Sequence, residues 1–141
     1  MKRATLALAG TIAVFALPVA ATGATSADSA AKAQRGGQDL VIKFTLRSRG
    51  GEATKIKRFR WNNLTLECNG GVTVDTEGLI REMEVNDRNR FRGSVNRDGR
   101  RVKVRGRVSG DLDTVRGTIR ARGPFAGATG CDSGRVRWKA S

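Results

Sequence analysis

A five-residue pattern that occurs three times in one stretch constrains the fold of this chain most. Residues 91–95 (FRGSV), 104–108 (VRGRV) and 115–119 (VRGTI) each consist of an apolar residue, arginine, glycine, a variable residue and an apolar residue. Successive copies start one strand plus one turn apart, which is typical of an antiparallel meander. Because neighbouring side chains on a strand point to opposite faces, the pattern predicts a row of glycines inside and arginines outside.

The remainder of the chain shows the same period of two. Residues 40–47 alternate between apolar and polar, as a half-buried strand does. A second strand is predicted over 53–61, with a bulge near Lys57 and Arg58, and a turn at residues 62–63. No stretch after residue 24 has apolar positions at helical spacing. The sequence therefore predicts an all-β fold, an antiparallel β-sandwich of about 8–9 strands, with a small closed or partly open β-barrel as the alternative.

Short turn motifs separate the later strands. Residues 69–71 (NGG) and the dipeptide Asp98-Gly99 predict tight hairpins, the second of type I′. Residues 79–86 favour a strand, and a short helix is the alternative. Residues 123–134 are rich in glycine and predict a long loop before the last strand.

The N-terminal region divides into two segments before the predicted domain. In residues 1–24, two basic residues, an apolar run and small residues suited to cleavage indicate a secretory signal peptide. The run is shorter than the roughly 20 apolar residues that span a bilayer; an uncleaved anchor is the alternative. Residues 25–38 are small and polar and predict a flexible leader. We therefore expect a secreted, extracytoplasmic protein with a single β domain over 39–141.

The two cysteines, Cys68 and Cys131, predict a disulfide, because an exported chain meets an oxidising compartment. The chain-entropy account gives roughly 4 kcal/mol of stabilisation for a loop of this length. Free thiols or metal ligation are the alternatives, but two cysteines without histidine make a poor zinc site.

The recurrence of Gly93, Gly106 and Gly117 needs a physical reason, since glycine weakens a strand interior. Packing beneath bulky side chains is favoured, with Trp61, Trp138 or both filling the space that the glycines leave. Sharp coiling of the sheet and a ligand groove lined by bare backbone are the alternatives.

Cations dominate the predicted outer face. The chain has 27 Lys and Arg against 13 Asp and Glu, a net charge of +14, which indicates attraction to polyanions. Like charges on adjacent strands repel, and a bound anion would relieve that repulsion, because guanidinium groups suit phosphate and carboxylate. The alternative is a solvated face whose repulsion is screened by salt.

The outward basic set comprises Arg90, Arg92, Lys103, Arg105, Arg107, Arg116, Arg120, Arg122, Arg135, Arg137 and Lys139. Within this set, the candidate anion-binding residues are Arg92, Lys103, Arg105, Arg107, Arg116, Arg120 and Arg122.

Catalysis has little support. The chain has no histidine, so a Ser-His-Asp triad and imidazole acid–base chemistry are excluded. Carboxylates two residues apart share a strand face. This arrangement is compatible with a glycosidase pair or a calcium site, but it more often consists of polar surface residues without a functional role. These pairs are Asp75/Glu77, Glu82/Glu84 and Asp111/Asp113. We expect no enzymatic activity, no catalytic residue, no metal and no cofactor.

The end of the chain, residues 130–138 (GCDSGRVRW), resembles that of small exported β domains with a single disulfide from high-GC Gram-positive bacteria. These domains end in Cys-x-x-Gly-x-Val-x-Trp and carry an earlier cysteine followed by glycines, here residues 68–71. The resemblance implies the fold, the disulfide and export, and it adds no activity.

The combined features predict a non-catalytic domain that binds an anionic envelope component through its arginine face: a polysaccharide, a wall polymer, or the headgroups of a membrane surface. A structural or protein-binding module with an acidic partner is the alternative, and a carboxylate-dependent hydrolase is the third. Nucleic acid is disfavoured, since no aromatic residues alternate with the arginines for base stacking. The sequence carries no signal for oligomeric state.

Overall fold

The computed structural model describes residues 25–33 and 39–141. The predicted signal peptide, residues 1–24, and residues 34–38 lie outside the described residues. The described part contains nine β-strands and one short 3-10 turn, η1 (Asn69–Gly71). The strands are β1 (Thr25–Ala33), β2 (Val41–Arg49), β3 (Glu52–Glu67), β4 (Thr73–Glu84), β5 (Arg90–Arg97), β6 (Arg100–Val108), β7 (Val115–Phe125), β8 (Ala128–Asp132) and β9 (Val136–Ala140).

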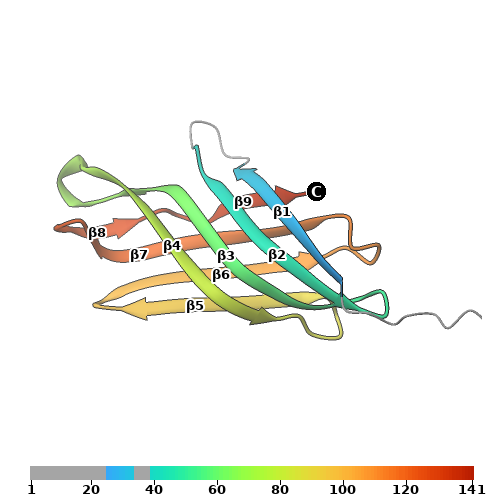
Figure 1. Cartoon of the computed structure of the whole chain (residues 1–141). Coiled ribbons are helices and arrows are strands. Elements are labelled where there is room, and N and C mark those ends of the chain that lie inside the picture. The colour runs from blue at the N-terminus through green and yellow to red at the C-terminus, as the bar shows by residue number, and fades with distance from the viewer. Residues whose placement is uncertain (1–24, 34–38) are drawn as a thin grey trace, which may run out of the picture.

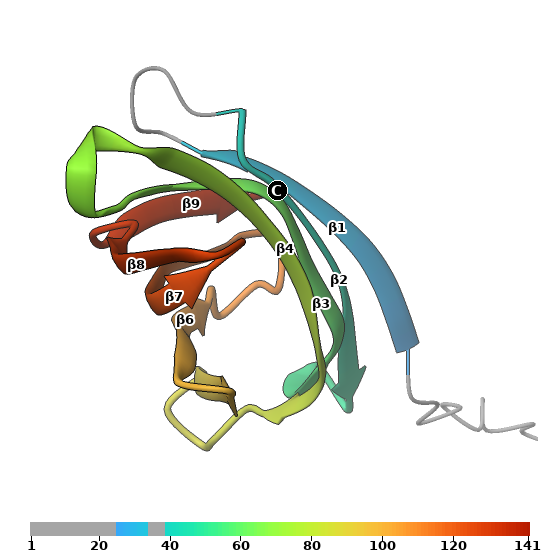
Figure 2. The same ribbon diagram turned by 90° about the vertical axis from the view of Figure 1, so that its left-hand side faces the viewer.

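All strands belong to one antiparallel sheet in the order β4-β3-β2-β1-β9-β7-β6-β5, and β8 pairs with β3 and β7 outside this path. The sheet curls strongly, so that β2–β4 face β5–β7 across a shared interior (Figures 1 and 2). The architecture is a half-barrel. The predicted all-β fold is confirmed, but the predicted pair of stacked sheets does not form, and the alternative of a partly open barrel describes the structure better.

Strand β1 joins the two halves along the main strand path of the sheet, and β8 joins them a second time at the end of β3. Strand β1 pairs with β2 along its length, from Thr25 opposite Ser48 to Lys32 opposite Val41, and with β9 near its end. The sequence predicts a flexible leader over 25–38, because the segment has no large apolar residue, whereas residues 25–33 form β1 instead. Backbone ladder hydrogen bonds do not depend on side-chain type, so apolar periodicity could not reveal this strand.

Strand β3 curls because two residues inside it adopt left-handed backbone angles. Arg58 has φ 50° and coincides with a register shift against β2, which confirms the predicted bulge near Lys57 and Arg58. Asn63 has φ 60° and coincides with a register shift against β4. The predicted turn at residues 62–63 is therefore wrong: Asn63 bulges a continuous strand, and bulges increase strand bending and twist.

The later strands follow the predicted turns except at one place. Asp98 and Gly99 have φ 51° and 76°, as a type I′ hairpin requires, and β4 runs as a strand through residues 79–84. The long loop predicted over 123–134 is wrong. β7 continues to Phe125, and a second tight turn at Ala126 and Gly127 leads into β8. The glycines of this region suggested a loop, although most of them lie within paired strands or tight turns.

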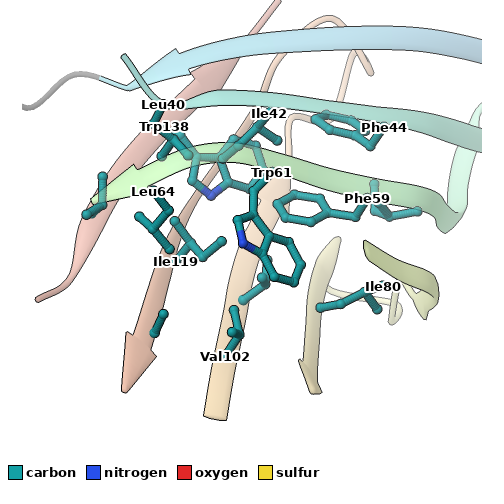
Figure 3. Close-up of a cluster of buried hydrophobic side chains, with 14 of the residues drawn as sticks. Leu40, Ile42, Phe44, Phe59, Trp61, Leu64, Ile80, Val102, Ile119 and Trp138 are labelled. Carbon is teal, nitrogen blue, oxygen red and sulfur yellow. The ribbon is translucent and has the colours of Figure 1, made fainter. Parts of the chain in front are cut away.

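The interior is built around Trp138 (Figure 3). Its ring centroid lies 5.5 Å from that of Phe59, 5.8 Å from that of Phe44 and 6.3 Å from that of Phe91. Tilted aromatic contacts at these separations stabilise beyond their buried area. Because these rings come from β2, β3, β5 and β9, a single side chain holds both halves of the curled sheet together.

The glycines of the repeat make room for this core, but they do not form one row. Gly106 pairs with Gly117, whereas Gly93 pairs with Val104. A Cβ at Gly117 would lie 2.7 Å from Trp138 Cζ2, and one at Gly106 would lie 2.7 Å from Phe91 Cε1. Both distances are too short for ordinary contact, so the bulky rings need these glycines.

Two further contacts of this kind occur, and neither these nor the contact of Phe91 with Gly106 was predicted. Trp61 packs over Gly78 of β4, where a Cβ would lie 2.5 Å from its Cη2 atom. Gly93 lies under Met83, with 2.7 Å between the position of a Cβ and the Met83 Cγ. Packing therefore explains each glycine, with a different partner in each case.

The predicted disulfide between Cys68 and Cys131 is confirmed. It joins the end of β3 to β8, next to the Glu67–Asp132 bridge between the same strands. The bond therefore holds the two halves of the sheet together at the end of the half-barrel where β8 lies.

We predict that Gly117→Ala destabilises the domain by about 1–3 kcal/mol, the usual cost of overpacking a core. The new methyl group would collide with Trp138 and with the Arg105 carbonyl oxygen. The free energy of unfolding in urea measures the effect. Gly110→Ala is the control, because a Cβ there meets nothing within 4 Å. An equal loss in both variants would contradict the packing account.

We predict that the double variant Cys68→Ser/Cys131→Ser loses about 4 kcal/mol of unfolding free energy, because the disulfide closes a 63-residue loop. Urea unfolding of the variant and of the reduced wild-type chain measures the loss. Both should behave alike, and a loss under about 1 kcal/mol would show that the bond does not restrict the unfolded chain as proposed.

Candidate anion-binding surface

Four neighbouring strands, β5, β6, β7 and β9, present basic side chains on their outer face. Three of them contain a basic–x–basic triplet and β7 contains Arg-Gly-Thr, at residues 90–92, 105–107, 116–118 and 137–139. The central residue of each triplet, Phe91, Gly106, Gly117 or Trp138, faces the interior. Strand alternation therefore places the flanking residues of every triplet on the outside.

Strand register aligns these triplets into two rows that run across the strands. The first basic row pairs one residue from each strand in the order Arg90, Arg107, Arg116 and Lys139. The second basic row likewise contains Arg92, Arg105, Thr118 and Arg137. Seven cations and one threonine thus occupy directly opposed positions, where Cβ atoms of neighbouring strands are about 4.5–5.5 Å apart.

The charges of these two rows are not neutralised within the part of the chain that the structure describes. Every cation in them is exposed, and none takes part in the ion pairs formed there. Like charges placed directly opposite each other destabilise a sheet. The arrangement is therefore unfavourable for the free protein and favourable for binding an anion.

Two shallow depressions lie between the rows, above the paired glycines. One is lined by Arg116, Gly117, Thr118, Arg137, Trp138 and Lys139. The other is lined by Glu84, Asn86, Arg90, Phe91, Arg92, Arg105 and Gly106. Each depression has basic side chains on both sides, and Glu84 is the carboxylate that borders the second one, at its β4 end.

A third group of cations on the same half is already bound to a carboxylate. Arg120 donates from Nε to Asp132 Oδ1 at 3.1 Å and from Nη2 to Oδ2 at 2.7 Å. Arg122 Nε lies 3.5 Å from the same Oδ2. The hydrogen bonds from Arg120 are the main reason that the pKa of Asp132 is lowered. The hydrogen bond from the Gly134 N–H and the positive charges of Arg120 and Arg122 lower it further, whereas partial burial acts in the opposite direction.

The residues beside Asp132 attach this segment to β7. The buried Ser133 hydroxyl accepts a hydrogen bond from the Ala121 N–H at 2.9 Å and donates one to the Gly134 carbonyl at 2.8 Å. The Gly134 N–H in turn donates to Asp132 Oδ1 at 2.8 Å. With the disulfide at Cys131, the Cys-Asp-Ser-Gly motif therefore serves as a structural attachment.

The outer face of the other half has a different charge pattern. Lys55 Nζ lies 2.8 Å from Glu82 Oε1 and 3.8 Å from Glu84, and Lys57 Nζ lies 3.5 Å from Glu82 Oε2. The hydrogen bond from Lys55 is the main reason that the pKa of Glu82 is lowered. Lys55 and Lys57 are thus compensated, whereas Arg60 and Arg81 on the same two strands are exposed and take part in none of the ion pairs formed among the described residues.

The structure places four of the seven predicted anion-binding residues in the basic rows, namely Arg92, Arg105, Arg107 and Arg116. Lys103 lies beside Arg92 and Arg105 at the next outward position along the strands, opposite Ser94 and Arg120. The remaining two, Arg120 and Arg122, are held by Asp132.

Three row residues, Arg90, Arg137 and Lys139, were in the wider outward set but not among the seven. Gly93 is out of register with the other two glycines, so the repeat does not align Arg90 with Arg107, and Arg137 and Lys139 lie on β9, outside the repeat. The basic–x–basic triplet is the pattern that marks all of them.

The three carboxylate pairs lie in different surroundings. Asp75 accepts a hydrogen bond from Thr65, Glu82 and Glu84 contact Lys55, and Asp111 accepts one from Ser109 in the β6–β7 turn. Within the described ranges, no group of three or more His, Cys, Asp or Glu residues is close enough to hold a metal ion. No helix in the same ranges has the length and apolar character needed to cross a bilayer.

Comparison with protein-family models, curated proteins and solved structures finds no match to this chain. The resemblance of the C-terminal motif to small exported β domains therefore stays a prediction. The functional argument rests on the basic surface itself.

We predict that Asp132→Asn lowers the stability at neutral pH and flattens its dependence on acid pH. The pKa of Asp132 is lowered in the folded state, so its contribution is present above about pH 4, the ordinary range for aspartate, and is lost as the pH falls through the folded pKa. Urea unfolding at a series of pH values measures this. Asp87→Asn, at an exposed turn position, is the control, and identical pH profiles for both variants would contradict the assignment.

Proposed function

We propose that this chain is a non-catalytic, extracytoplasmic binding domain that holds an anionic component of the cell envelope on the outer face of β5, β6, β7 and β9. One observation carries the proposal. Seven cations stand in two opposed rows, and none has a carboxylate partner among the described residues.

Two further observations support this function. On β3 and β4, Lys55 and Lys57 are paired with glutamates, whereas no cation of the two basic rows has such a partner among the described residues. Six of the seven row cations are arginines, whose planar guanidinium groups bind carboxylate and phosphate with two hydrogen bonds. The disulfide between Cys68 and Cys131 supports a location outside the cytoplasm, since disulfides persist in oxidising compartments.

We predict that Arg105→Glu/Arg116→Glu elutes from a sulfated resin at clearly lower salt than the wild-type chain. Each substitution removes one cation from a row and adds an anion. At a given moderate salt concentration the affinity should fall about tenfold or more, because each exposed ion pair contributes roughly 0.2–1 kcal/mol and reversal adds repulsion.

The control is Arg60→Glu/Arg81→Glu, which makes the same change in net charge at exposed positions of β3 and β4. Its elution should shift much less. Equal shifts in the two double variants would show that net charge alone determines retention, and the proposed surface would then be wrong.

A further inference from the structure

The two basic rows and the residues between them form a trough with a defined direction. Between the rows, Phe91, Gly106, Gly117 and Trp138 are aligned across the same four strands. Neighbouring strands lie about 4.8 Å apart, so the trough extends for about 14 Å across the strands. The rows are two residues apart along each strand, which corresponds to about 7 Å.

Other charged residues border the trough at its β5 end and along one side. At the β5 end, Glu84 borders the depression and would repel an anionic chain. Beyond the second basic row, Asp132 binds Arg120 and Arg122. Lys103 lies on the same side of the trough, beside Arg92 and Arg105, is exposed and takes part in none of the ion pairs of the described residues, so it extends the basic strip formed by the two rows.

Two kinds of polyanion fit this strip poorly. The aromatic rings beneath it, Phe91 and Trp138, are 4% and 2% exposed, so no base can stack on them as single-stranded nucleic acids require. The exposed large apolar side chains of the described residues are Val72 and Leu79, both in the β3–β4 half. The strip thus has no apolar anchor for a membrane, and it lies on the outer surface of a curled sheet (Figure 2).

We propose that the trough binds an extended acidic polysaccharide that lies across β5, β6, β7 and β9, with its carboxylate groups directed alternately toward the two basic rows. The inference rests on the proposed function and names the ligand class for the same surface. The residues between the rows point into the interior, so backbone forms the floor of the trough, and Thr118 adds a hydroxyl group among the cations.

The test is the binding of the full chain to galacturonic acid, its oligomers of increasing length, and polygalacturonate. The affinity, expressed per oligomer molecule, should increase with oligomer length until the oligomer spans the four strands, and should then level off. An affinity that does not depend on length, or that still increases steeply well beyond this span, would overturn the trough.

Two variants test whether both rows take part. Arg107→Glu/Arg116→Glu alters the middle of the first row, and Arg92→Glu/Arg105→Glu alters the second. Each should reduce the affinity for the longest oligomer about tenfold or more, and the Arg60→Glu/Arg81→Glu control should change it much less. Thermal unfolding of all variants checks that they fold. An effect of only one row would overturn the proposal.

Vesicles that contain anionic phospholipid, and single-stranded DNA, distinguish this inference from the proposed function. If vesicles bind through the basic rows and oligogalacturonates do not, the polysaccharide assignment is wrong and the proposed function stands. Tighter binding of single-stranded DNA than of polygalacturonate at the same salt would also overturn the assignment. If none of the three binds at moderate salt, the proposed function fails as well.

Discussion

The close contact between two glycines and two aromatic rings sets the geometry of this domain. Gly106 and Gly117 face each other on β6 and β7, and Phe91 and Trp138 from the flanking strands fill the space above them. A Cβ at Gly117 would collide with Trp138 and with backbone, so a different residue cannot replace it without movement. A shift of one residue between strands would also turn the core side chains outward. This contact therefore holds β5, β6, β7 and β9 in one register.

The same register produces the basic surface. Because Phe91, Gly106, Gly117 and Trp138 are aligned inside, the residues on either side of them must be aligned outside. Core packing thus accounts for the position of every cation in the two rows, at the cost of repulsion between like charges. On β3 and β4, glutamates lie opposite lysines, as Glu82 does opposite Lys57, which shows that the fold does not itself demand unpaired cations.

Three connections hold the curled sheet together around this core. β1 hydrogen-bonds to both β2 and β9, the Cys68–Cys131 disulfide joins β3 to β8, and Ser133 attaches the segment after β8 to β7. Two of these come from the Gly-Cys-Asp-Ser-Gly stretch, where Asp132 also binds Arg120. This motif therefore has a structural role, and the proposed anion-binding surface lies elsewhere.

Local sequence patterns were sufficient to predict the all-β class, the Asp98-Gly99 turn, the bulge near Arg58, the disulfide and the outward direction of the arginines. Each depends on neighbouring residues or, for the disulfide, on a single possible pair. Strand β1, the half-barrel and the two basic rows required the tertiary structure, because backbone pairing and register between strands leave no mark on local alternation. Only the fold shows that Asp132 neutralises Arg120 and Arg122. Only the fold, likewise, places Arg90, Arg137 and Lys139 in the two basic rows.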